Sequence, residues 1–157
     1  AKINKLAKEG DAQAIHFPRG HIEGHPYDFS FSGLKSAVLN YLNSCEMKGI
    51  AVNQADVAAS FQKAVIDVLV GHSMDAVSQY HFKKFAIAGG VASNTSLRAA
   101  FEKACREKGL EFYHPSPVYC TDNAAMIGVA GYYEYCKGTR HGWDLNAVPN
   151  LKLGERI

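Results

Sequence analysis

The stretch FAIAGGVASNTSLR, residues 85–98, decides the fold. It begins as a short apolar run, which is typical of a strand, and it passes through Gly89 and Gly90. After the turn, apolar residues recur at helical spacing, so a strand is expected to lead directly into a helix. In sheets built from parallel strands and helices, ligands bind at such corners, beyond the carboxyl ends of the strands. Residues 89–94 are therefore a candidate binding corner.

Two interpretations of this corner stand side by side. Gly89 and Gly90 have no side chains, so a ligand could approach the backbone there. The helix that follows offers free N–H groups at its start, and the Asn94 amide can both donate to and accept from a ribose or a base. A plain glycine turn with Asn94 or Thr95 as helix cap explains the same residues, and by spacing alone it is the more common case. No G-K-[ST] follows, so this is not a P-loop.

Outward from this corner, strands and helices are expected to alternate, which predicts an α/β fold. The expected elements are a strand in YDFSFSG (27–33), a helix capped by Ser32 and ended by Gly49, a helix from Asn53 or Asp56 to about Tyr80, a strand in KKFAIAGG (83–90), a helix from Thr95 to Gly109, a strand in LEFYHPSP (110–117) and a helix within 120–138. We expect one lobe, with a helix end and loop at 1–26, the α/β core at 27–138 and an irregular tail at 139–157.

A second strand-to-helix corner contains Asp122, in the stretch CTDNAAMI. A carboxylate at the start of a helix is stabilised by the helix dipole, so Asp122, or Thr121, could be the cap. The alternative is that Asp122 points into the same crevice as the glycine turn, as a metal or substrate ligand. One carboxylate alone does not make a metal site, so spacing favours the cap.

The stretch HIEGH, residues 21–25, places two histidines four residues apart around Glu23. On a helix this spacing would direct both imidazoles to one face, as a zinc site requires. Gly24 and Pro26 argue against a helix, since proline disfavours the helical region for the residue before it. The glutamate is also at the wrong offset for an H-E-x-x-H peptidase. A metal site on His21 and His25 is therefore not expected.

Bulk properties exclude several classes of protein. The net charge of +2 over 157 residues does not indicate nucleic acid or a membrane surface. No apolar run approaches the roughly 20 residues of a membrane span. The four cysteines form no C-x-x-C pair, which argues against a disulfide framework or zinc ribbon and favours a reducing, cytoplasmic compartment.

Four blocks together resemble one family. DFSFSGLKSAVL (28–39), AASFQKAVIDVLV (58–70), AGGVASNTSLR (88–98) and CTDNAAMIGVAG (120–131) are similar, in order and spacing, to the bacterial TsaD (Gcp) family of tRNA N6-adenosine threonylcarbamoyltransferases. The resemblance extends from Ile3 to WDLN (143–146). It implies the actin-like ATPase (ASKHA) fold of two ribonuclease-H-like lobes. This chain resembles only the later, C-terminal part of the second lobe, so it is expected to lack the first lobe and the opening strands of the second.

The resemblance implies a chemistry for particular residues. The family transfers the threonylcarbamoyl group of threonylcarbamoyl-adenylate to N6 of adenosine 37 in tRNA. Gly89, Gly90 and Asn94 match its adenylate-binding block, so ATP or the adenylate is the expected nucleotide. Asp122 matches a ligand of a divalent iron or zinc ion. Asn4 stands where many relatives have a substrate-contacting Asp, so that contact would lack its charge.

The family's metal-binding histidines belong to an H-x-E-G-H motif in the first lobe, far upstream. The HIEGH stretch of this chain matches that motif in its residues but not in its position, because it lies in the loop before DFSFSG. It is therefore interpreted as a coincidence.

The resemblance also implies partners: tRNA, a catalytically inactive paralogue and a small P-loop ATPase. A chain of this extent is expected to be inactive alone and to self-associate through uncovered apolar surface. The alternatives are the metallopeptidase of the family's old label, acting through residues 21–25, an ASKHA small-molecule kinase lobe, and a lobe that only binds other proteins.

Overall fold

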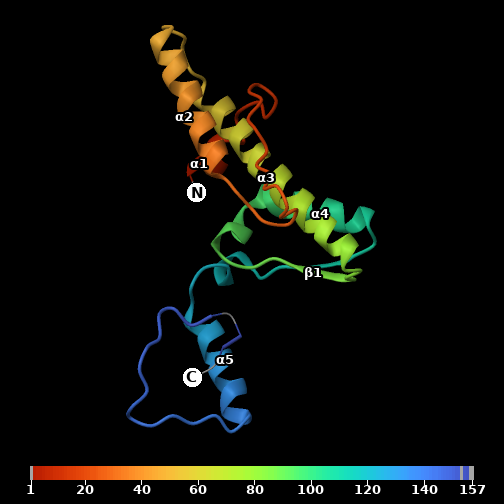
Figure 1. Ribbon diagram of the computed structural model, residues 1–157, viewed down its shortest axis with the longest axis vertical. Helices are drawn as coiled ribbons and strands as arrows, with labels where there is room; N and C mark the ends of the chain where they lie inside the picture. The colour runs from red at the N-terminus through yellow and green to blue at the C-terminus, as the bar shows by residue number, and fades with distance from the viewer. Residues whose placement is uncertain (1, 153, 156–157) are drawn as a thin grey trace. The chain divides into compact units, whose positions relative to one another are not determined.

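In the computed structural model, two parallel strands are joined by a helix that packs on them (Figure 1). The structure describes residues 2–152, 154 and 155 and forms two units, 1–121 and 122–157, which are treated separately. The elements of the first unit are α1 (Lys2–Leu6), α2 (Ser32–Met47), α3 (Gln54–Gln79), β1 (Lys84–Ala86), η1 (Gly90–Ser93), α4 (Thr95–Glu107), β2 (Glu111–Tyr113) and η2 (Pro117–Tyr119).

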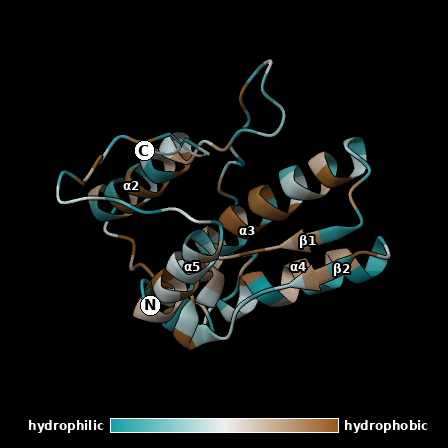
Figure 2. Ribbon diagram, turned by 90° about the horizontal axis from the view of Figure 1, so that it is seen from below, coloured by the Kyte–Doolittle hydropathy of each residue, from teal (hydrophilic) through white to brown (hydrophobic). Residues whose placement is uncertain are grey.

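The segment β1–α4–β2 is the crossover unit that residues 83–117 predict. Phe85 of β1 lies opposite Phe112 of β2 in parallel register, and a parallel pair requires a long connection, here α4. The expected order of strand, helix and strand is thereby confirmed for residues 83–117, and the structure is compatible with the α/β class. In Figure 2, α4 carries both apolar and polar colour, as expected of a helix with one buried face.

The larger core cluster lies where α4 meets the sheet and the second half of α3. Phe101 is 3% exposed, and its ring centroid lies 4.9 Å from that of Phe85 and 6.3 Å from that of Phe112. Met74 and Val77 of α3 close the other side of this cluster. The strand and helix of the predicted corner are thus both anchored in one core.

A second cluster joins the first half of α3 to α2 and to the loop that precedes α2. Its buried members are Phe17, Leu34 and Ala64, one from each of these three segments. Because both clusters include α3, this helix connects the α2 side of the unit with the β–α–β side.

The loop between α1 and α2 follows one side of α3 over several turns (Figure 1). The Ile15 backbone N–H donates to Ser60 Oγ at 3.1 Å, and Ser60 is buried. Further along, Arg19 Nη2 donates to Asp67 Oδ2 at 2.6 Å. A loop with no strand partner thus satisfies backbone and charged groups against side chains of the helix.

The prediction of a strand in YDFSFSG is wrong. Residues 28–31 are neither strand nor helix. The neighbour of this stretch is α3: His72 Nδ1 lies 3.1 Å from the Asp28 carbonyl oxygen, and the His72 ring stacks on Phe29 with centroids 5.7 Å apart. The backbone N–H and C=O groups of a helix are hydrogen-bonded within the helix, so they cannot pair with a strand. The residues of this stretch therefore contact α3 through side chains and a single carbonyl group instead.

The helix starts are confirmed in part. Asn53 caps α3, accepting a hydrogen bond from the Ala55 backbone N–H at 3.0 Å, as predicted. The Ser32 cap is wrong: Ser32 is the first helical residue of α2, the cap position is Phe31, and no side chain caps this end. Phe31, which packs against the second core cluster, occupies the cap position that the spacing assigned to Ser32.

The second unit contains α5 (Ala124–Cys136) and a tail. Gly138, at φ +87°, follows the end of α5, as predicted. Residues 139–152, 154 and 155 contain no helix or strand, which confirms the irregular tail for the described residues; 153, 156 and 157 lie outside them. None of the described helices combines the length and apolar character needed to cross a bilayer. The three-part division at 26 and 138 stays a prediction.

The Arg19–Asp67 pair makes the attachment of the loop dependent on pH. Burial by itself raises the pKa of the Asp67 carboxyl, but hydrogen bonds from Arg19 and Lys63 outweigh this, so the pKa lies below its ordinary value. The native state therefore binds this proton less readily than the unfolded chain, and stability falls as pH drops.

We expect Asp67→Asn to lower the free energy of unfolding by about 0.5–1 kcal/mol at pH 7, the scale of a partly exposed ion pair. The difference from the wild type should shrink as pH falls from about 5 through the lowered pKa. Urea denaturation from pH 7 to pH 2.5 measures it. Asp75→Asn, at an exposed position on the same helix, is the control. Parallel pH profiles for wild type and Asp67→Asn would contradict the role of the pair.

Candidate functional site

A cavity of about 410 Å³ lies at the predicted glycine corner. It brings together three residues that the family resemblance selects: Asn4 from α1, Gly90 from η1, and Asn94 from the start of α4. Every lining side chain is uncharged: Ile3, Asn4, Phe61, Gln62, Val65, Ile66, Leu69, Gly90, Val91, Ser93, Asn94 and Leu97. The site is thus suited to an uncharged ligand group with a few polar atoms.

The two glycines of the corner have different physical roles. Gly89 does not line the cavity; it adopts φ +87° and ψ 172°, a region that essentially only glycine occupies. This turn lets the Gly89 carbonyl accept from the Ala92 N–H at 3.0 Å and start η1. Gly90 does line the cavity, and a Cβ built on it would meet Thr121 Cγ2 at 3.9 Å, an ordinary contact.

Asn94 is both a helix cap and a wall of the cavity. Its Oδ1 accepts from the Leu97 backbone N–H at 3.0 Å, which confirms the predicted cap. Its Nδ2 donates to Gln62 Oε1 at 2.9 Å. The two interpretations of Asn94 are therefore compatible, because the cap uses the oxygen and leaves the amide nitrogen on the cavity side. Its contact with a ligand stays a prediction.

Asn4 lines the cavity and also has one unsatisfied polar atom. Its Oδ1 is buried and has no hydrogen-bond partner among the described residues. A buried acceptor without a donor costs about 1–3 kcal/mol, and native structures contain few of them. The contacts among the described residues therefore leave this oxygen unsatisfied.

Gln62 of α3 is a site residue that the sequence analysis missed. It joins Asn94 to Ser96, because its Nε2 donates to Ser96 Oγ at 3.2 Å. The available signal was a single amide in the apolar stretch of the AASFQKAVIDVLV block, on the helix face that includes Val65 and Leu69. Helical periodicity alone could not tell whether that amide faces solvent or a cavity.

Asp122 begins the second unit, and its side chain is exposed. Its interpretation as the helix cap is wrong, and so is that of Thr121: Asn123 caps α5, with Oδ1 accepting from the Met126 N–H at 2.9 Å. The carboxylate of Asp122 is thus not used to cap the helix. Its approach to the cavity, and its role as a metal ligand, stay predictions.

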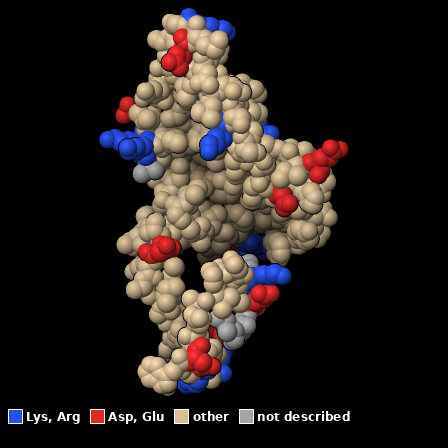
Figure 3. Space-filling view, turned by 60° about the vertical axis from the view of Figure 1, so that its left-hand side comes forward, with Lys and Arg blue, Asp and Glu red and all other residues tan. Residues whose placement is uncertain are grey.

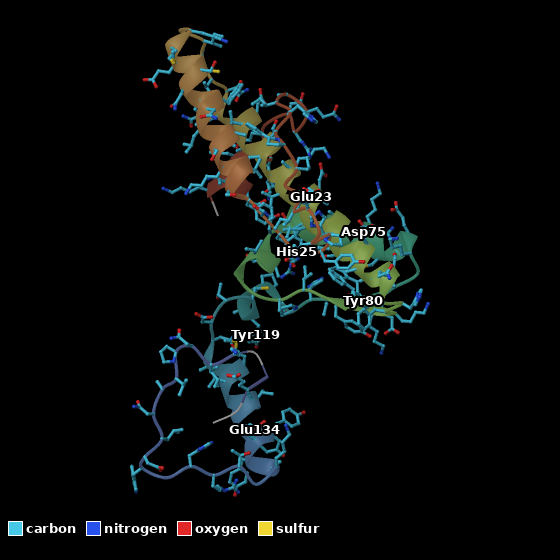
Figure 4. The ribbon with its side chains drawn as sticks, viewed as in Figure 1. Glu23, His25, Asp75, Tyr80, Tyr119 and Glu134 are labelled. Atoms are coloured by element: carbon cyan, nitrogen blue, oxygen red, sulfur yellow. The ribbon has the colours of Figure 1, made fainter. Side chains whose placement is uncertain are left out.

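The HIEGH stretch is not helical, as Gly24 and Pro26 predict. Figure 4 shows Glu23 and His25 on the loop beside α3. His25 Nδ1 lies 3.5 Å from Asp28 Oδ2, and each of these two side chains is 66% exposed.

Throughout the described part of the chain, no three His, Cys, Asp or Glu side chains gather closely enough to hold a metal ion. The described residues therefore do not by themselves fit a complete metal centre, and no chemical step is assigned to one.

A larger cavity of about 470 Å³ is lined by residues of α1, α2 and α3 and by Val52 from the segment between α2 and α3. Its walls are apolar apart from Lys35 and Gln54, and it includes none of the residues predicted for binding. On the face drawn in Figure 3, lysine and arginine side chains are scattered and do not form one basic patch. We therefore take the smaller, more polar cavity as the candidate site.

A comparison of the sequence with protein families shows to which family the chain belongs. The sequence profile of TsaD, described as tRNA N6-adenosine threonylcarbamoyltransferase, matches residues 1–129. The chain belongs to the TsaD family. The match includes both strands, the crossover helix and every residue selected above as a ligand contact.

Curated relatives of the TsaD chain agree. It is 58% identical over 155 residues to a protein of Clostridium botulinum strain Hall, 56% to one of Clostridium beijerinckii and 54% to one of Clostridium perfringens strain 13. All three are named tRNA N6-adenosine threonylcarbamoyltransferase. Each alignment covers 99% of this chain and 46% of the relative, so the chain spans about half their length. These names support the transferase expectation and not the metallopeptidase or kinase alternatives.

The unusual backbone of Gly89 gives a direct test of the corner. We expect Gly89→Ala to lower the free energy of unfolding by about 1–3 kcal/mol, because alanine is strained at this φ and ψ. Gly90→Ala is the matched control, since its added Cβ meets only Thr121 at a normal distance. Urea denaturation of both variants measures the difference. Equal losses for the two glycines would contradict the assigned strain.

Proposed function

We propose that this chain is the C-terminal lobe, of ASKHA type, of an enzyme that transfers the threonylcarbamoyl group of threonylcarbamoyl-adenylate to N6 of adenosine 37 in tRNA. The observation that carries the proposal is that Asn4, Gly90 and Asn94 converge on one cavity whose described lining residues are all uncharged. Membership of the TsaD family supports it. Transfer is proposed for the protein at the relatives' full length, to which these 157 residues contribute the adenylate-binding side.

The cavity suits the nucleoside part of the adenylate. A phosphate placed among uncharged side chains would lose its hydration without gaining a cation, which is costly. A ribose or adenine brings apolar surface for Phe61 and Leu69, together with polar atoms for the two asparagines. We infer that the nucleoside enters the cavity and that the phosphate stays at its mouth, near the backbone that Gly90 leaves open.

The proposed reaction is an acyl transfer. The N6 amine attacks the threonylcarbamoyl carbonyl carbon, a C–N bond forms, the C–O bond to the phosphate breaks, and AMP leaves with that electron pair while N6 loses a proton. This chain's part is to hold the adenylate so that its carbonyl is presented in one orientation. Asp122 is proposed as one ligand of a divalent iron or zinc ion.

The proposal implies particular partners and a compartment. Besides tRNA, we propose a catalytically inactive paralogue and a small P-loop ATPase as protein partners, and the cytoplasm as the place of action. We propose that the 157 residues alone do not complete the transfer.

Nucleotide binding by this chain tests the proposal. We expect calorimetric titration with AMP or ATP to give a measurable affinity that Asn94→Asp weakens about tenfold or more, by replacing a donor with a charged acceptor. Asp retains the helix cap, so folding is preserved. Asn53→Asp, at the cap of α3, is the matched control and should bind as the wild type does. No binding heat with the wild type, or equal binding by Asn94→Asp, would contradict the adenylate site.

Self-association is proposed on a separate observation, the apolar surface of α5. No residue of α5 is buried, and Ile127 and Tyr132 are 66% and 63% exposed. A helix that is apolar on all sides is normally covered by other protein surface. We expect light scattering to give multiples of 17.1 kDa, and Ile127→Asp to restore the single mass. A wild-type monomer that does not bind a hydrophobic dye would contradict this.

A further inference from the structure

The positions of the oxygen and nitrogen atoms in the side-chain amides of Asn94 and Gln62 can be derived from one backbone N–H group. The Leu97 N–H can only donate, so the Asn94 atom 3.0 Å away must be the oxygen. The other end of the Asn94 amide is then the NH₂ group. The Gln62 atom 2.9 Å from it must accept and is therefore Oε1, which directs Nε2 to Ser96 Oγ. The orientation of both amides, normally a matter of assignment, thus follows from α4's own backbone.

These hydrogen bonds determine which Asn94 hydrogen is left for a ligand. One Nδ2 hydrogen is used by Gln62. The second has no partner among the described residues, and Asn94 lines the cavity. The same cavity includes Asn4, whose Oδ1 is a buried acceptor without a donor. The mostly apolar wall thus includes Asn94, which has one Nδ2 hydrogen without a partner among the described residues, beside the polar residues Asn4, Gln62 and Ser93.

We propose that Gln62 is a positioning residue that holds the Asn94 amide so that its free N–H faces the cavity. Without Gln62, Asn94 is held only through Oδ1, and its side chain can turn about that single hydrogen bond. With Gln62, both ends of the amide are held, so the donor keeps one direction and the ligand does not have to order it on binding. Gln62 acts through Asn94 and is not itself assigned a contact with the ligand.

The pairing also specifies the ligand group that the cavity takes. An uncharged moiety that accepts a hydrogen bond from Asn94 fits this wall, and adenosine carries such acceptors on its ribose and on its base. The choice of adenosine rests on the proposed function, whereas the Gln62–Asn94 geometry does not. An anionic group is disfavoured because none of the described residues that line this cavity is charged.

The test uses the 157-residue protein and adenosine as the probe. Gln62→Met keeps the length and apolar contact of the side chain and removes both hydrogen bonds. Gln79→Met, at the exposed end of the same helix, is the matched control. We expect the Asn94 Nδ2 hydrogens to change chemical shift and exchange faster with solvent in Gln62→Met only, as measured by NMR. Adenosine affinity should fall about tenfold in Gln62→Met and stay unchanged in Gln79→Met.

A double-mutant cycle separates positioning from general loosening. In an Asn94→Asp background, Gln62→Met should cause no further loss of adenosine affinity, because the group that it positions is gone. Additive losses, or unchanged Asn94 amide signals in Gln62→Met, would overturn the positioning role. Altered amide signals in a protein that takes up no adenosine would support the Gln62–Asn94 geometry and overturn the adenylate site instead.

Discussion

The structure of the first unit depends on the burial of α3 from several directions at once. Its 26 residues pack against α1, α2, α4 and the long loop, and both core clusters include it. Helices of this length gain most of their stability from such packing and not from intrinsic propensity. The polar groups of the helix are divided accordingly, with Ser60 and Asp67 holding the loop and Gln62 lining the cavity.

This arrangement places the cavity against a rigid support. One wall is α3, whose position is set by two hydrophobic clusters, and the opposite wall is the corner between β1 and α4. The hydrogen bond between Gln62 and Asn94 joins these walls directly. Because the amides are held from both elements, the cavity is shaped before any ligand arrives, and less free energy is spent on ordering it.

The residues at the corner show why local structure and binding are difficult to separate in a sequence. Asn94 was expected either as a cap or as a ligand contact. The structure confirms the cap through Oδ1 and shows Nδ2 bonded to Gln62, whereas the ligand contact stays a prediction. At Asp122 the outcome differs, because the neighbouring Asn123 takes the cap. Spacing places a polar residue at a helix start, but which of two adjacent side chains reaches the backbone N–H depends on dihedral angles that spacing does not report.

The features that the sequence determined by itself follow from patterns in short segments of the chain. These are the two short strands, the crossover helix, the caps at Asn53 and Asn94, and the glycine stops, since each depends on neighbours along the chain. The sequence blocks also identified the family.

The tertiary structure decided three other features. YDFSFSG lies against α3 instead of pairing as a strand, Gln62 is hydrogen-bonded to Asn94, and the buried Asn4 Oδ1 has no hydrogen-bond partner among the described residues. Each of these depends on contact between residues more than 30 positions apart, or on burial produced by such contacts. The periodicity of a single segment carries no information about which distant surface it will meet.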